Sequence, residues 1–143
     1  MRKRKKSQQV QDRMSAPPFT ISSEDSLENA IDLIHKHNIR ELPVVDHGKL
    51  IGIVTDRDLR EIAPSYPIFR DQQEIRRYLK TLKVASAMTV DPLVVSPDTP
   101  LVEAARLLLT YRIGSLPVVE KERLVGMISV SDLLKDFIDN SRR

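Results

Sequence analysis

The sequence predicts an α/β (α+β) fold made of two β-α-β-β-α repeats packed about an internal pseudo-two-fold axis. A heptapeptide, Gly52–Asp58, returns in similar form as Gly126–Asp132, 74 residues later. The same offset relates Leu42–Val45 to Leu116–Val119, each a Leu-Pro-Val-Val run. A unit of about 50 residues is too small to bury a good core alone. We therefore expect the two units to pack together and to form two similar clefts between them.

In the first unit, residues 19–21 are predicted to form a short strand after the bend at Ala16–Pro18. Asp25 and Glu28 have the spacing of a capping box, which predicts a helix that ends near His37–Asn38. One face of this helix is apolar, at Leu27, Ala30, Ile31 and Ile34. Strands at 42–45 and 50–55, joined by a turn at 46–49, predict a hairpin, and a second helix starts near Asp56 and stops before Pro64.

Residues 64–83 have no counterpart in the other unit. Asp71 and Glu74 again have capping spacing, and an apolar stripe predicts one amphipathic helix, with Ile75, Tyr78, Leu79 and Leu82 on its face. The pattern of the first unit then returns from Val84, with Thr99 as the helix N-cap, Pro100 at the first helical position and a longer last helix. The expected organisation is a disordered basic arm at 1–9, repeats at 10–63 and 84–140, and a linker at 64–83.

Composition and charge bear on nucleic-acid binding, membrane insertion and the cellular compartment. Five of the 23 basic residues lie within residues 2–6, which leaves 18 basic and 20 acidic residues in the rest of the chain. Nucleic-acid binding is therefore not expected of the folded body, and only the arm can reach phosphates or anionic lipid. No apolar run approaches the ~20 residues that cross a bilayer. The chain has no cysteine, which agrees with a reducing cytoplasm.

The duplicated heptapeptide supports two interpretations. A hydroxyl residue followed three residues later by an acid is a helix-capping pattern, so Thr55 with Asp58 and Ser129 with Asp132 can simply start helices. Its repetition at one fixed offset, along with the strands and helix faces around it, also fits a duplicated ligand site.

The chain resembles a tandem pair of CBS domains, known as a Bateman module. The resemblance is carried by residues 38–46 with 52–58 and by residues 112–120 with 126–132, and it extends over roughly residues 10–139. The Thr-Asp-Arg-Asp-Leu-Arg stretch at 55–60 is similar to acetoin-utilisation-type CBS proteins. Those usually have a further C-terminal regulatory domain, which we expect this chain to lack.

The resemblance implies regulation by adenosine-containing ligands, such as AMP, ADP or ATP, that bind in the clefts between the repeats. In such modules the motif hydroxyl contacts phosphate or ribose, the acid binds the ribose hydroxyls, and apolar residues enclose the base. Carried over by position, the implied nucleotide-binding residues are Thr20, Ile21, Arg40, Pro43, Thr55, Arg57 and Asp58 in the first repeat, and Val94, Val95, Gly114, Ser115, Pro117, Ser129, Ser131 and Asp132 in the second.

The two clefts are not expected to be equivalent. Arg40 is a candidate phosphate partner beside the repulsive Glu41, whereas Gly114 and Ser115 at the same positions have no charge. Arg57 has only the uncharged Ser131 as its counterpart in the second repeat. These arginines are equally compatible with a solvated surface, where such residues usually lie.

No catalytic or metal-binding role is assigned to any residue. The sequence shows no Ser-His-Asp arrangement, no Walker-type phosphate loop and no cluster with metal-ligand spacing, so we do not expect an enzyme or a resident cofactor. The preferred function is a homodimeric sensor that signals nucleotide occupancy to an unknown regulated partner. The alternative is a structural or interaction module with vestigial clefts.

Overall fold

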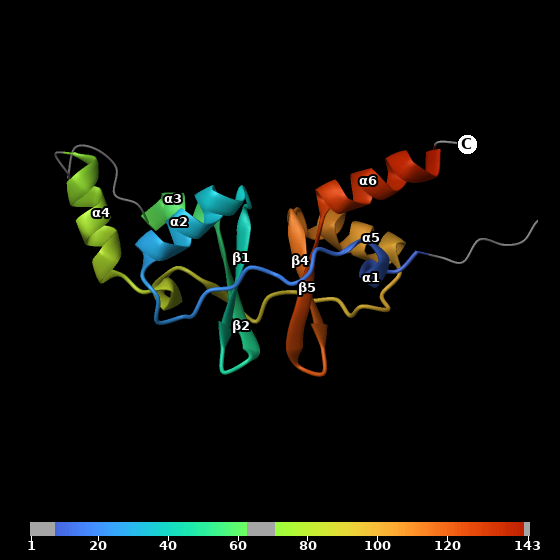
Figure 1. Ribbon diagram of the computed structural model, residues 1–143, viewed down its shortest axis with the longest axis horizontal. Coiled ribbons are helices and arrows are strands. Elements are labelled where there is room, and N and C mark those ends of the chain that lie inside the picture. Colours follow the sequence, from blue (N-terminus) through green and yellow to red (C-terminus); the bar gives the residue numbers. More distant parts are fainter. Residues whose placement is uncertain (1–7, 63–70, 142–143) are drawn as a thin grey trace, which may run out of the picture. The chain divides into compact units, whose positions relative to one another are not determined.

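The computed structural model describes residues 8–62 and 71–141, and it divides into two compact units (Figure 1). The first-repeat unit comprises residues 19–92, and the second-repeat unit comprises residues 1–18 with 93–143. Residues 1–7 of the expected disordered arm, and residues 64–70 of the expected linker, lie outside the described residues. Each unit thus takes its core helices and hairpin from one repeat and its lead-in segment from the other. The lead-in segments are the first residues of each repeat, 10–18 and 84–92.

The first-repeat unit is a hairpin covered by helices. Its elements are α2 (Leu27–His37), β1 (Glu41–Asp46), β2 (Lys49–Thr55), α3 (Asp56–Ile62), α4 (Gln72–Thr81), the 3-10 turn η1 (Val84–Ser86) and β3 (Thr89–Val90). Strands β1 and β2 pair antiparallel from Glu41 opposite Thr55 to Asp46 opposite Lys49. The two turn residues, His47 and Gly48, both have positive φ, as a tight type I′ connection requires. Strand β3 pairs with β2.

The second-repeat unit repeats this plan. Its elements are α1 (Val10–Arg13), α5 (Leu101–Tyr111), β4 (Ser115–Glu120), β5 (Arg123–Ser129) and α6 (Val130–Ser141). Strands β4 and β5 pair in the same register as β1 and β2, with a bulge at the matching place, Val118–Val119. Lys121 and Glu122 occupy the turn at positive φ although neither is glycine.

Each unit buries its own apolar core. The first core is centred on Leu27, Leu42, Val44, Val54 and Val84, which are all inaccessible to solvent, and the second on Val10, Leu116, Val118 and Ile128. The apolar helix face predicted at residues 27–34 is confirmed, because Leu27, Ala30 and Ile34 of α2 are buried and Ile31 packs, partly buried, against the same core. Leu101, Ala104 and Leu108 of α5 are buried in the same way.

The lead-in segments are held in an equivalent way in the two units. In the first-repeat unit the Val84 amide donates to the Asp25 carbonyl at 2.7 Å, and in the second-repeat unit the Val10 amide donates to the Thr99 carbonyl at 2.8 Å. The Gln8 carbonyl accepts from the Leu101 amide at 3.0 Å. Because these bonds are related by the 74-residue offset, each lead-in joins the start of the other repeat's first helix.

Three local predictions are corrected. Residues 19–21 form no full strand, since only Ile21 makes a bridge, to Val44. The N-cap of α2 is Ser26, not Asp25, because the Asp25 carboxylate instead accepts from the Ser22 amide at 3.1 Å and closes the preceding turn. Pro100 is the N-cap of α5 and not its first residue, since the Thr99 hydroxyl is used by the Ser96 amide.

Other local predictions are confirmed. Helix α2 ends at His37 with Asn38 in the left-handed conformation, and both hairpins are present. The linker helix is α4, and the Asp71 side chain caps it by accepting from the Glu74 amide at 2.9 Å. Helix α4 lies beside α2 (Figure 1), where Arg76 is 3.6 Å from the Glu28 carboxylate.

Glycine is required in both inner strands. A Cβ at Gly52 would lie 2.8 Å from the Thr89 carbonyl oxygen and 2.9 Å from the Met88 sulfur. A Cβ at Gly126 would lie 2.8 Å from the Met14 sulfur and 2.9 Å from the Ser15 carbonyl oxygen. The missing side chain therefore lets each methionine-bearing lead-in approach the hairpin closely.

We predict that Gly52→Ala lowers the free energy of unfolding by about 1–3 kcal/mol, because the Thr89 backbone cannot move as a flexible side chain can. Urea unfolding measures this, and Gly126→Ala should behave alike. Thr110→Ala, at an exposed position of α5, is the control and should stay within about 0.5 kcal/mol of wild type. A Gly52→Ala protein as stable as this control would show that the close approach is not required.

Candidate functional site

The first motif lies where β2 ends and α3 begins. The Thr55 amide donates to Asp58 Oδ2 at 3.0 Å, and the Asp58 amide donates to Thr55 Oγ1 at 3.0 Å. This reciprocal pair is a capping box. The capping interpretation is thus confirmed, and any ligand role of Asp58 has to coexist with it.

The second motif repeats this geometry between β5 and α6. The Ser129 amide donates to Asp132 Oδ2 at 2.8 Å, and the Asp132 amide donates to Ser129 Oγ at 3.3 Å. The Ser129 hydroxyl also donates to Asp132 Oδ2 at 3.0 Å. The two acids therefore occupy equivalent positions, each with Oδ2 engaged in the cap.

The residues just before β1 and β4 are fixed beside these helix starts. The Arg40 carbonyl accepts from the Asp56 amide at 2.8 Å, and the Gly114 carbonyl accepts from the Val130 amide at 3.0 Å. Ser115, the next residue after Gly114, lies opposite Ser129 in the register of the hairpin. The structure thus places Arg40 with the first motif, and Gly114 and Ser115 with the second.

A second set of predicted site residues gathers around β1 and β4. The Ile21 amide donates to the Pro43 carbonyl at 3.1 Å, and the Val95 amide donates to the Pro117 carbonyl at 3.0 Å. These four residues are buried, whereas their neighbours Thr20 and Val94 are exposed. Each unit therefore has an apolar strand edge with one exposed residue beside it.

Arg57 and Ser131, inside the motifs, are both exposed. Arg57 lies 3.5 Å from Glu61 one helical turn later, and Arg60 is 3.3 Å from Asp56 in the same way. Exposed pairs of this spacing contribute only about 0.3–0.5 kcal/mol. Such weak pairing leaves Arg57 able to exchange its partner for a ligand anion.

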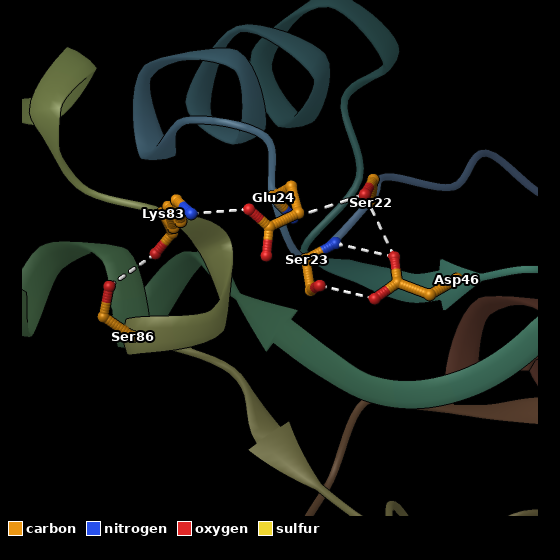
Figure 2. Close-up of polar contacts among 6 residues, drawn as sticks. All are labelled: Ser22, Ser23, Glu24, Asp46, Lys83 and Ser86. Carbon is orange, nitrogen blue, oxygen red and sulfur yellow. Dashed lines mark hydrogen bonds and ion pairs between the residues drawn. The ribbon is translucent and has the colours of Figure 1, made fainter.

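Sequence reasoning missed a polar cluster around Asp46 at the end of β1 (Figure 2). The Asp46 carboxylate accepts from the Ser22 hydroxyl at 3.0 Å, from the Ser23 amide at 3.1 Å and from the Ser23 hydroxyl. Hydrogen bonds from Ser23, first its hydroxyl and then its amide, lower the pKa of the Asp46 carboxyl. The cluster fixes residues 22–23 directly after Ile21, and so it positions the strand edge just described.

The second repeat has no equivalent cluster at the matching positions, Ser96, Pro97 and Glu120. There the Ser96 hydroxyl donates to Asp98 at 2.5 Å, and Glu120 is exposed. The signal in the sequence was an acid directly after the Val44–Val45 run together with two consecutive serines after Ile21. Because Pro97 lacks both donors of Ser23, the cluster could have been predicted to form in the first repeat alone.

Comparison with known proteins identifies the class. A protein-family profile described as the CBS domain matches residues 9–65 and again residues 84–139. The chain therefore belongs to the CBS domain family, in which it is a tandem pair. The predicted fold class and family are thereby confirmed.

One relative is a CBS domain-containing protein of Dictyostelium discoideum, 41% identical over 128 residues, which are 87% of this chain and 88% of the relative. Among solved structures, a putative acetoin utilization protein (AcuB) from Vibrio cholerae is 33% identical with a TM-score of 0.79, covering 95% of this chain and 94% of that one.

Two further solved structures are complexes. The CBS domain pair of protein MJ0100, in complex with 5′-methylthioadenosine and S-adenosyl-L-methionine, is 30% identical with a TM-score of 0.76 over 94% of this chain and 99% of that one. CBSX2 in complex with AMP is 29% identical with a TM-score of 0.78 over 94% of this chain and 98% of that one. These structural neighbours are CBS-pair domains that bind adenosyl ligands.

The described residues contain no group of three or more His, Cys, Asp or Glu side chains that could hold a metal ion. No helix among them is both long and apolar enough to cross a membrane.

The Asp46 cluster predicts a pH-dependent stability. A carboxyl whose pKa is lower in the folded state adds stability at pH values above its unfolded value of about 3.9, and this contribution is lost as the pH falls through the folded value. We therefore expect Asp46→Asn to melt below wild type at pH 7, with the difference shrinking as the pH falls below about 4. Thermal melts between pH 7 and pH 3 measure it.

Glu120→Gln is the matched control, because it makes the same kind of change at the equivalent position of the second repeat, where the acid is exposed. Its melting temperature should follow wild type at each pH. A gap between Asp46→Asn and wild type that stays constant down to pH 3 would contradict the role given to the carboxylate.

Proposed function

We propose that this CBS pair is a regulatory module that binds adenine nucleotides (AMP, ADP, ATP or a related adenosyl ligand) and signals their occupancy to a partner protein. The observation that carries the proposal is the duplicated pair of Asp58 and Asp132, each held at a helix start by the same capping bonds. The adenosyl complexes of the structural neighbours support the ligand class.

The chemistry of the motif suits a nucleoside. A carboxylate can accept from both hydroxyls of a ribose, and such charge-assisted bonds are stronger than neutral ones. With Oδ2 used by the cap, Asp58 still has Oδ1 and the remaining lone pair of Oδ2 for this contact. Thr20 is exposed beside the buried strand edge at Ile21 and Pro43, where it can contact the base, and the exposed Arg40 offers a cation for a phosphate.

We further infer that the chain has no catalytic activity of its own, that it acts in the cytoplasm, and that it forms a homodimer. The basic arm is not assigned a ligand. A module with vestigial clefts is the alternative, and it is favoured by the uncharged Gly114 and Ser115, which stand in the second repeat where the first has Arg40 and Glu41.

We predict that Asp58→Asn and Asp132→Asn each weaken binding at their own motif by about 10- to 100-fold, because Asn keeps one acceptor but loses the charge. For AMP the loss should be larger with Asp58→Asn, since Arg40 and Arg57 accompany only that acid. Isothermal titration measures the affinities. Without ligand, both variants should melt close to wild type, because Asn can also cap a helix.

The same titrations decide between the two functions. Equal AMP affinity for wild type and both variants would reduce the motifs to helix caps and favour the vestigial module. A larger loss from Asp132→Asn would retain the function and move the stronger AMP site to the second repeat.

The dimer is proposed to form through α6. Its exposed face carries Leu134, Phe137 and Ile138, which are 57%, 70% and 51% exposed. Leu133, in contrast, packs against the core of its own unit. Large apolar side chains grouped in this way typically mark an association surface.

We expect light scattering to give a dimer mass at micromolar concentration, and Phe137→Asp to shift it to the monomer mass by weakening association at least tenfold, as for a typical hot-spot aromatic. Lys135→Ala, an exposed change elsewhere on α6, should leave the dimer intact. A monomer mass for the wild type, with and without AMP, would exclude this dimer.

A further inference from the structure

Ser115 carries a buried hydroxyl that the surrounding structure does not use. The residue is only 7% exposed, and its Oγ has no hydrogen-bond partner among the described residues. Burying a hydroxyl without a partner is unfavourable, so nearly all such groups in folded proteins are paired. This hydroxyl therefore points to a partner supplied from outside the chain.

The position of Ser115 places that partner at the start of α6. Ser115 lies opposite Ser129 in the antiparallel pair β4–β5, and opposite residues in such a pair project from the same face of the sheet. Ser129 is the hydroxyl of the second capping box and is bonded to Asp132. The hydroxyl of Ser115 thus faces the same helix start as the proposed ribose-binding acid.

The two helix starts differ in how many charged residues surround them, and only the first has cations at the compared positions. Six equivalent positions can be compared, pairing Arg40 with Gly114, Glu41 with Ser115, Asp56 with Val130, Arg57 with Ser131, Asp58 with Asp132 and Arg60 with Leu134. All six are charged in the first repeat, whereas only Asp132 is charged in the second. A phosphate placed there would meet a carboxylate and no cation at these positions.

The helix itself does not offset this charge. A helix start attracts anions through its unpaired amides, but at α6 the Asp132 amide is bonded to Ser129 Oγ and the acid already lies at the positive end. An uncharged group that can hydrogen-bond to a hydroxyl, in contrast, would satisfy Ser115 without repulsion from Asp132.

We propose that the two repeats select ligands of different charge. The second repeat takes an adenosyl ligand without a phosphate, with the Ser115 hydroxyl as a specificity-determining contact, and the first repeat takes the phosphorylated ligand. This inference rests on the proposed function, since it requires Asp58 and Asp132 to bind adenosyl ligands.

Adenosine and AMP are suitable probes because they differ only in the phosphate. Each is titrated calorimetrically into Asp58→Asn, which leaves the second repeat as the stronger site, and into Asp132→Asn, which leaves the first. We expect the Asp58→Asn protein to bind adenosine at least about tenfold more tightly than AMP. We expect the Asp132→Asn protein to bind AMP more tightly than adenosine.

The role of Ser115 is tested in the same Asp58→Asn background. Adding Ser115→Ala should weaken adenosine binding about threefold to tenfold, the effect of losing one neutral hydrogen bond. Without ligand, the double variant should melt at or above its parent, because the hydroxyl it loses has no protein partner. Thr110→Ala in the same background is the control, with unchanged affinity and melting temperature.

The outcomes separate this inference from the proposed function. If neither probe binds wild type, this inference fails, and if ADP and ATP do not bind either, the proposed function fails with it. If both bind but their order is the same in the two backgrounds, only the charge selection is overturned. A Ser115→Ala protein with unchanged adenosine affinity, or with a lower melting temperature, would make Ser115 a structural residue.

Discussion

Each of the two units depends on a close approach between a lead-in segment and a glycine of its inner strand. Without a Cβ at Gly52 or Gly126, a methionine and a backbone carbonyl reach the strand at distances that no other residue would allow. That approach lets β3 pair with β2, and lets Ser15 bridge Met127. It also brings Val84 and Val10 fully into the two cores. Each compact unit is therefore completed by a segment that the sequence attaches to the other repeat.

The same architecture allows the proposed ligand motif to serve as a helix cap as well. Strands β2 and β5 each end in a hydroxyl residue, and the acid three residues later completes a capping box within its own unit. The acid is thereby oriented before any ligand binds, which reduces the entropy that binding would have to offset. Under the proposed function, stability and recognition share the same four side chains, so ligand preferences would diverge between the repeats at neighbouring positions, such as Arg40 and Ser115.

Much of the fold was predictable from the sequence because the same pattern of apolar, turn and capping residues occurs in both repeats. The helix faces, the hairpins and the start of α3 follow from apolar spacing and turn residues, and the motif geometry follows from a hydroxyl and an acid three residues apart. The pairing of lead-ins with the opposite repeat was not predictable, since the 74-residue offset is the same for either arrangement. The N-cap at Ser26 was missed because two adjacent residues could each cap, and the choice depends on the turn that Asp25 closes.

Asp58 and Asp132 are proposed to bind the ribose of an adenosyl ligand while they cap their helices. A crystal structure of the protein grown with AMP would show whether they do. We predict ribose hydroxyls within hydrogen-bond distance of at least one of these carboxylates, with the bonds between Thr55 and Asp58, or between Ser129 and Asp132, still formed. AMP bound away from both acids, or density for AMP at neither motif under saturating conditions, would contradict it.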